Sequence, residues 1–116
     1  MMSVTLPWPP AQLSPNFRTR RASWIGAVRK AYRAKVAEAI WARGVRPTDG
    51  VALREIIFHP PTRAKRDDDN LRAMFKAGRD AVAEVLGVDD VTFNEIPHRI
   101  GAVVKGGSVV AMIETP

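Results

Sequence analysis

The sequence predicts a small α/β (α+β) domain in which a mixed sheet packs with two main helices. Three observations favour this fold. The chain has 116 residues, which is enough for one compact domain over residues 1–116. Short segments that alternate apolar and polar residues predict strands. Two longer segments, with apolar residues at three- and four-residue steps, predict helices, and together the elements follow the order β-α-β-α-β-β.

One strand and one long helix are expected first. Residues 3–8, "SVTLPW", alternate apolar and polar side chains and predict a short strand. Residues 9–21 are rich in Pro, Asn and Ser, which is typical of a loop. Residues 23–43 contain no proline and carry a helical stripe of apolar side chains, with Ser23 as the expected N-cap and Gly44 just past the end.

The second half predicts a strand, a helix and further strands. Residues 51–59 form the expected strand, which two prolines end. Residues 71–86 are the clearest helix, because their apolar side chains fall on one face, and Gly87 is its expected C-cap. Residues 93–115 predict strands with a turn at residues 105–107, "KGG".

The net charge of +6 and the pI of about 10.5 indicate a polyanionic partner. Clustered cations bind nucleic acid through counterion release, and nucleic acid is the commonest such partner. The alternative is a basic surface with no partner of this kind. The clusters are Arg18, Arg20 and Arg21; Arg29, Lys30, Arg33 and Lys35; and Arg63, Lys65 and Arg66.

The composition also excludes several kinds of site. The chain has no cysteine, so disulfides, cysteine-bound zinc and thiol nucleophiles are excluded. The N-terminus lacks the basic and apolar regions of a signal peptide. No apolar run approaches the roughly 20 residues that cross a bilayer. We therefore expect a cytoplasmic protein without a membrane partner.

An acidic cluster follows the third basic cluster, in "KRDDDN" at residues 65–70. Carboxylates bind Mg²⁺, often one or two of them with waters and a phosphate, and such an ion activates water for phosphodiester cleavage. A second acidic pair, Asp89 and Asp90, follows the helix. That helix of about 16 residues is roughly 24 Å long, so Asp90 meets the first cluster only if the chain folds back or a second chain supplies it.

The alternative is that these acids only begin a helix. Asp and Asn are preferred N-cap residues, and acids in the first turn interact favourably with the helix dipole, so Asp69 or Asn70 is a candidate cap. Capping accounts for one or two residues, and leaves three consecutive acids in a basic protein without an explanation. The residue spacing excludes an EF-hand loop.

Several motifs occur in one order. Asp67-Asp68-Asp69-Asn70 gives an Asp-x-Asp-Asn signature, and Lys76, an Asp-Ala step at residues 80–81 and the Asp89-Asp90 pair follow it. Outside this region lie "LPWPP" at residues 6–10, "KAYR" at residues 30–33, and "KGG" before an apolar strand. In this order the motifs resemble the RusA-type Holliday junction resolvases of phages and prophages. The resemblance covers nearly the whole chain.

The resemblance implies a homodimeric, Mg²⁺-dependent endodeoxyribonuclease, with Mn²⁺ able to substitute and no small-molecule cofactor. Its substrate would be branched DNA, a four-way junction cut by paired symmetric nicks during recombination and repair. By motif, Asp67, Asp69 and Asp90 are the metal-binding and catalytic acids, with Asp89 as the rival third acid. The alternatives are a non-catalytic DNA-binding protein of the same fold, or a nuclease for flaps and other branches.

The lysine of the family pattern departs from its usual place. In the family it follows the asparagine by three positions, which is Ala73 here, whereas Lys76 comes three residues later. We expect Lys76 to be a catalytic residue that contacts phosphate or stabilises charge. The alternative is a surface ion pair with Asp80 at i,i+4. The DNA-binding candidates are Arg63, Lys65, Arg66, Arg18, Arg20 and Arg21.

The aromatic residues and histidines give weaker indications. Trp8, Trp24 and Trp41 are expected in the core rather than as base-stacking groups. Phe17 precedes the first basic cluster, as aromatics do in single-strand or junction binders, although a basic loop explains it equally. We expect His59 at the surface, with a DNA contact as the alternative, and His98 in a structural role.

Overall fold

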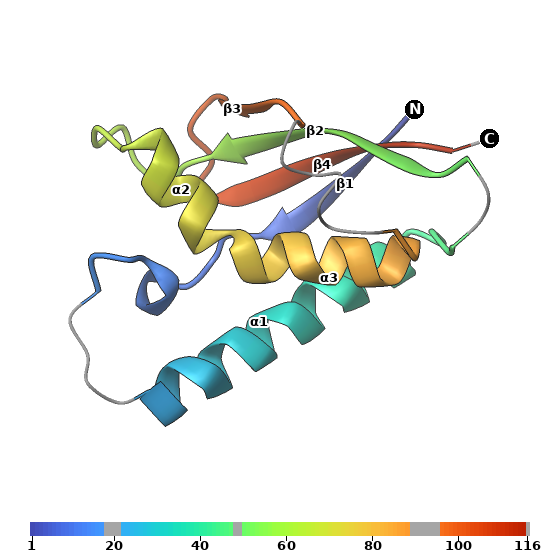
Figure 1. Ribbon diagram of the computed structural model, residues 1–116. Helices are drawn as coiled ribbons and strands as arrows, with labels where there is room; N and C mark the ends of the chain where they lie inside the picture. The colour runs from blue at the N-terminus through green and yellow to red at the C-terminus, as the bar shows by residue number, and fades with distance from the viewer. Residues whose placement is uncertain (18–21, 48–49, 89–95, 116) are drawn as a thin grey trace.

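A computed structural model describes residues 1–17, 22–47, 50–88 and 96–115 of the chain. It shows one small α+β domain with a mixed four-stranded sheet, which confirms the predicted fold class and element order. The elements in Figure 1 are β1 (Met2–Pro7), the 3₁₀ helix η1 (Ala11–Leu13), α1 (Ala22–Ala42), β2 (Ala52–His59), α2 (Asp68–Met74), α3 (Lys76–Leu86), β3 (His98–Ile100) and β4 (Ser108–Glu114).

The sheet has the strand order β1-β4-β2-β3. β4 lies between β1 and β2 and pairs antiparallel with both, and β3 pairs parallel with β2 at the edge. The predicted turn before β4 is present, and Gly106 and Gly107 both have positive φ there. This turn does not join neighbouring strands, because β2 separates β3 from β4.

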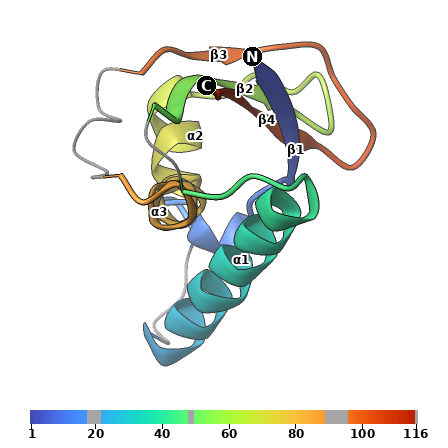
Figure 2. The ribbon, with the colours of Figure 1, turned by 90° about the vertical axis from the view of Figure 1, so that its right-hand side faces the viewer.

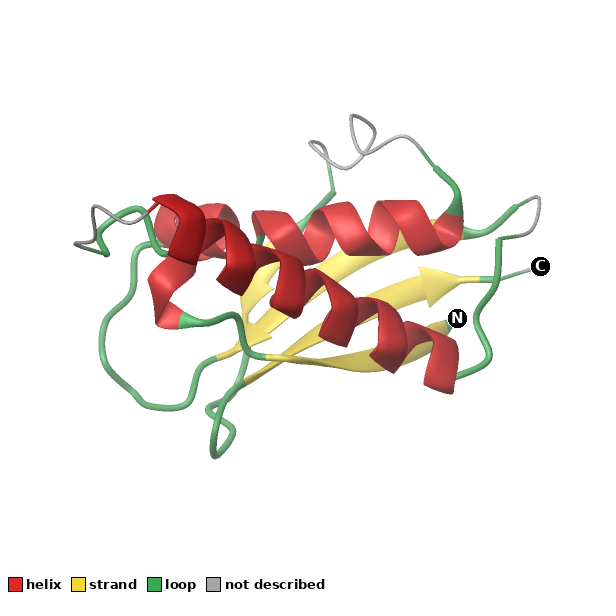
Figure 3. Cartoon of the chain, turned by 90° about the horizontal axis from the view of Figure 1, so that it is seen from below, coloured by secondary structure: helices red, strands yellow, loops and turns green. Residues whose placement is uncertain are grey.

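The helices cover one face of the sheet, with α1 and α3 packed together (Figures 2 and 3). Alternate residues of the strands face this layer and are buried, as period-2 alternation requires. The sheet contributes Val4, Leu6, Ile56, Phe58, Val109, Ala111 and Ile113, and the helices contribute Val36, Ile40, Phe75, Val82 and Leu86. Among the described residues, no helix is both long enough and apolar enough to cross a membrane.

The helix predicted over residues 71–86 is wrong in one respect, because the structure has two helices there. α2 ends and α3 begins around Phe75, whose φ of −87° and ψ of 0° depart from helical geometry. The Phe75 ring is 1% exposed and lies directly over Gly78, where an added Cβ would overlap it. The apolar side chains therefore stay on one face through the break between α2 and α3, and their spacing does not indicate that break.

The predicted helix ends are partly correct. Gly44 and Gly87 follow α1 and α3 with φ of 79° and 69°, the left-handed conformation that glycine adopts most easily. Ser23 is not an N-cap, because α1 already begins at Ala22. The residues immediately before it lie outside the described part of the chain.

Edge-to-face aromatic contacts join the two layers. Phe58 of β2 meets Phe75 with ring centroids 5.7 Å apart at 85°, and Phe75 meets Tyr32 of α1 at 6.5 Å and 74°. Trp8 also packs edge-to-face against Phe58, with ring centroids 6.3 Å apart at 82°. Tyr32 Oη donates a hydrogen bond of 2.7 Å to the Pro7 carbonyl at the end of β1, and burial raises the pKa of this phenol.

We predict that Gly78→Ala destabilises the protein by about 1–3 kcal/mol, since the added methyl must displace a buried ring packed between Phe58 and Tyr32. Urea unfolding followed by far-UV circular dichroism measures this. Gly26→Ala is the matched control, because nothing lies within 4 Å of the new Cβ. That helical substitution is expected to stabilise the protein by about 0.5–1 kcal/mol, and equal effects at the two sites would contradict the packing argument.

Candidate metal and nucleic-acid site

The acidic cluster lies at the N-terminus of α2, and Asp67 caps the helix. Its backbone is extended, with φ of −85° and ψ of 125°, and its Oδ1 accepts a 2.9 Å hydrogen bond from the Asp69 N–H. The expectation that Asp69 or Asn70 caps the helix is therefore wrong. This hydrogen bond satisfies an otherwise unpaired backbone donor through Oδ1, while Oδ2 of Asp67 has no hydrogen-bond partner among the described residues.

The three aspartates are not equivalent. Asp68 Oδ2 lies 3.3 Å from Arg72 Nε on the next turn, an i,i+4 ion pair along α2. No ion pair among the described residues involves Asp67 or Asp69, and both side chains are exposed. Asp68 therefore differs from its two neighbours in having an ion-pair partner among the described residues.

A pocket of about 240 Å³ lies beside this helix start. It brings the acid of Asp67 next to the basic side chains of Lys65 and Arg66 and the amide of Asn70. The remaining lining comes from Ser14, Leu71 and Met74. Asp69 lies outside this lining on the adjoining exposed surface of α2.

Arg66 holds the loop that leads into the site. Its guanidinium donates to the carbonyls of Thr62 and Ala64 at 3.0 and 2.8 Å and to Thr62 Oγ1 at 3.1 Å. It also lies 6.0 Å from the centroid of the Trp8 ring. Arg66 is therefore largely engaged within the protein, whereas Arg63 and Lys65 are exposed on the same loop.

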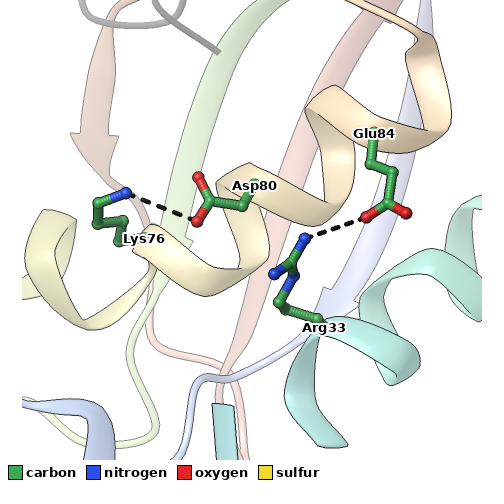
Figure 4. A network of polar contacts seen from close by, with 4 residues as sticks. All are labelled: Arg33, Lys76, Asp80 and Glu84. Carbon is green, nitrogen blue, oxygen red and sulfur yellow. Dashed lines mark hydrogen bonds and ion pairs between the residues drawn. The ribbon is translucent and has the colours of Figure 1, made fainter. Parts of the chain in front are cut away.

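Lys76 begins α3, and its Nζ lies 3.6 Å from Asp80 Oδ2, as the i,i+4 spacing permits (Figure 4). The lysine side chain is 62% exposed, which leaves it accessible to a ligand. A second pocket of about 340 Å³ includes Lys76, Asp80, Arg29 and also Ala73. Ala73, where the RusA-type pattern has its lysine, and Lys76 therefore border the same pocket. Met74 lines both this pocket and the pocket beside Asp67.

The donor set fits Mg²⁺ in part. Asp67 borders the pocket and Asp69 lies outside it, so the described residues bring one of the two predicted carboxylates to the pocket, where Mg²⁺ commonly takes one or two acids from a protein. Within residues 1–17, 22–47, 50–88 and 96–115, no group of three or more His, Cys, Asp or Glu side chains is placed to hold a metal. The predicted third acid, Asp90 or its rival Asp89, lies outside these residues, as do Arg18, Arg20 and Arg21.

The chain returns towards α2 after α3. His98 of β3 pairs in register with Ile56, stacks on Phe58 with centroids 5.9 Å apart, and donates from Nδ1 to the Ile96 carbonyl at 2.7 Å. Burial lowers the pKa of His98, and the nearby guanidinium groups of Arg72 and Arg79 lower it further. The Ile96 carbonyl and the Asp68 carboxylate oppose this shift. The structural role expected for His98 is therefore confirmed.

The expectation for the tryptophans needs correction. Trp24 and Trp41 are 42% and 51% exposed and do not belong to the core, whereas Trp8 packs against it. His59 is partly exposed at the end of β2, and its Nδ1 lies 2.8 Å from the Ala102 carbonyl. Trp24 lies on α1 before its first buried residue, Tyr32, and Trp41 follows its last, Ile40.

Comparison with known proteins gives one relative and no function. No family model matches the chain. An uncharacterized protein of Xylella fastidiosa is 40% identical over 116 residues, an alignment that covers 97% of this chain and 76% of that protein.

We predict that stability falls on acidification through His98. Its folded pKa is lowered, so stability is complete above 6.5, the ordinary pKa, and is lost as pH falls through the folded pKa. His98→Asn, which keeps a donor for the Ile96 carbonyl, is expected to reduce this loss. Urea unfolding of both proteins between about pH 7.5 and pH 5 measures it. Parallel curves would contradict the assignment, since His59 is common to both.

Proposed function

The chain belongs to the same family as the Xylella fastidiosa protein, and we propose that it is a Mg²⁺-dependent endodeoxyribonuclease that resolves four-way DNA junctions. The observation that carries this proposal is the position of Asp67 and Asp69 at a helix start reached through a basic loop, where both are exposed and neither forms an ion pair with another described residue. The motif order resembling RusA-type resolvases supports the same activity.

Asp67 and Asp69 would hold the metal ion, Asp67 through the oxygen that its capping hydrogen bond leaves free. When bound, such an ion supplies an activated water and stabilises the leaving oxygen of a phosphodiester. Asp90, with Asp89 as its rival, is the proposed third acid. Asp68 is already paired with Arg72 and has no part in this set.

The basic residues of the loop before α2 would bind the DNA backbone. Arg63 and Lys65 are exposed and suited to phosphate contact, and each neutralised phosphate makes affinity more dependent on salt. Arg66 is better suited to positioning, because its hydrogen bonds to Thr62 and Ala64 fix the loop. The cations would thus bring a polyanion to carboxylates that repel it on their own.

Lys76 would act on the same phosphates from the neighbouring pocket. Its ammonium group is exposed and separated from the Asp67 pocket by the shared wall of Met74. A cation there stabilises negative charge that develops on a phosphoryl oxygen. Resolution of a junction needs two matched nicks, and we propose a homodimer because two-fold symmetry supplies two such sites.

We predict that Asp67→Asn and Asp69→Asn each reduce nicking of a synthetic four-way junction by at least about 100-fold, because a metal ligand worth several kcal/mol is lost. Asparagine caps helices as well as aspartate, so Asp67→Asn keeps the start of α2. Asp68→Asn is the matched control, with the same change of charge in the same turn. It is expected to stay within about threefold of the parent protein, since it loses only a surface ion pair.

The assay compares the junction, a flap and a linear duplex, with Mg²⁺, with Mn²⁺ and with EDTA. Symmetric nicks confined to the junction, dependent on the metal, are the expected result. Tight binding without nicks would replace the proposal with a non-catalytic DNA-binding protein. Equal cutting of flaps and junctions would replace it with a general nuclease for branched DNA.

A separate prediction concerns Lys76 and its ion pair. Lys76→Gln is expected to lower the nicking rate at saturating junction by about 10- to 100-fold, whereas Asp80→Asn leaves the rate within about threefold. Both changes break the same ion pair, so a role limited to that pair would give equal losses. Single-turnover kinetics with and without each change distinguish the two outcomes.

A further inference from the structure

The N-terminal half of α1 extends beyond the packed body of the protein (Figure 2). The buried residues of this helix are Tyr32, Val36 and Ile40, and none of residues 22–31 is buried. The polar contact between α1 and α3 that Figure 4 shows, Arg33 with Glu84, also lies beyond this half. The first turns of α1 therefore present an open surface.

Two aromatic side chains meet at this end. Phe17 and Trp24 lie with ring centroids 5.9 Å apart at an interplanar angle of 60°, and they are 37% and 42% exposed. Neither belongs to the hydrophobic core or packs against it. Exposing two large aromatics that touch each other costs hydrophobic free energy, which an arriving planar group would recover.

The pair is connected to both pockets of the candidate site. The Phe17 N–H donates a 3.0 Å hydrogen bond to the carbonyl of Ser14, which borders the Asp67 pocket. Leu13, the preceding residue, borders the Lys76 pocket together with Arg29 of α1. The turn at residues 14–17 and the helix after Trp24 thus lead from the aromatic pair towards the acids and Lys76.

The charge around the pair favours nucleic acid over an apolar protein partner. Arg29 and Lys30 follow Trp24 on α1, both exposed and in no ion pair among the described residues. The whole chain carries a net charge of +6. Exposed aromatics beside cations bind unpaired bases, because every base has a face that stacks while its phosphates meet the cations.

We propose that Phe17 and Trp24 form a stacking site for an unpaired base of the DNA substrate. This inference rests on the proposed function and names the feature that the enzyme would recognise next to the cleaved strand. In a continuous duplex both faces of a base are covered by its neighbours. At a branch point a base can leave the stack, so the aromatic pair gives a preference for branched or single-stranded DNA with little dependence on sequence.

The test measures binding in EDTA, so that it does not depend on cleavage. Fluorescence anisotropy compares a labelled single strand, a four-way junction and a blunt duplex with the parent protein and with Trp24→Ala. The variant is expected to bind the single strand and the junction roughly tenfold more weakly, and the duplex within about twofold. Trp24→Phe, which keeps an aromatic face, is expected to restore most of the affinity.

Trp41→Ala is the matched control, because Trp41 is a similarly exposed tryptophan at the other end of the same helix. Trp41→Ala is expected to leave the affinity for the single strand, the junction and the duplex unchanged. Equal losses at Trp24 and Trp41, an equal loss on the duplex, or no loss from Trp24→Ala with a native circular dichroism spectrum would each overturn the stacking site. A protein that binds unpaired bases through Trp24 but never nicks would instead overturn only the nuclease.

Discussion

The contact between the rings of Phe58 and Phe75 joins the sheet to the helical layer, and the rest of the structure depends on it. Phe58 comes from the strand that leads into the basic loop, and Phe75 lies at the break between α2 and α3. Both rings are almost completely buried. Because Tyr32, Trp8 and His98 pack around them, this one contact fixes α1, the end of β1 and the start of β3 relative to α2.

The charged residues lie on this apolar framework without being part of it. No charged side chain is fully buried among the described residues, so the acids and bases at the start of α2 remain hydrated and available. One carboxylate oxygen of Asp67 caps the helix, and the other makes no hydrogen bond within the described part of the chain. Residue type alone groups Arg66 with the DNA-binding cations, and in the structure its guanidinium donates hydrogen bonds to the backbone of its own loop.

Local patterns in the sequence predict most of the fold. Period-2 alternation locates β1 and β4, an apolar segment that prolines end locates β2, and glycine locates the ends of α1 and α3, because these signals depend on neighbouring residues only. At the break, the Phe75 ring packs over Gly78 and against Phe58 of β2. The spacing of neighbouring residues does not report such a tertiary contact. The exposure of Trp24 has the same origin, since the apolar pattern of α1 continues past the point where its tertiary contacts end. The motif did not reveal that Asp67 caps the helix.

The order of strands in the sheet has a consequence for how the protein is made. β4 follows β1, β2 and β3 along the chain, yet it lies between β1 and β2 and pairs with both. Until residues 108–114 have left the ribosome, β1 and β2 lack the strand between them, and the edges that pair with β4 stay open. A shorter nascent chain therefore cannot complete this sheet, and its open edges are exposed to aggregation until then.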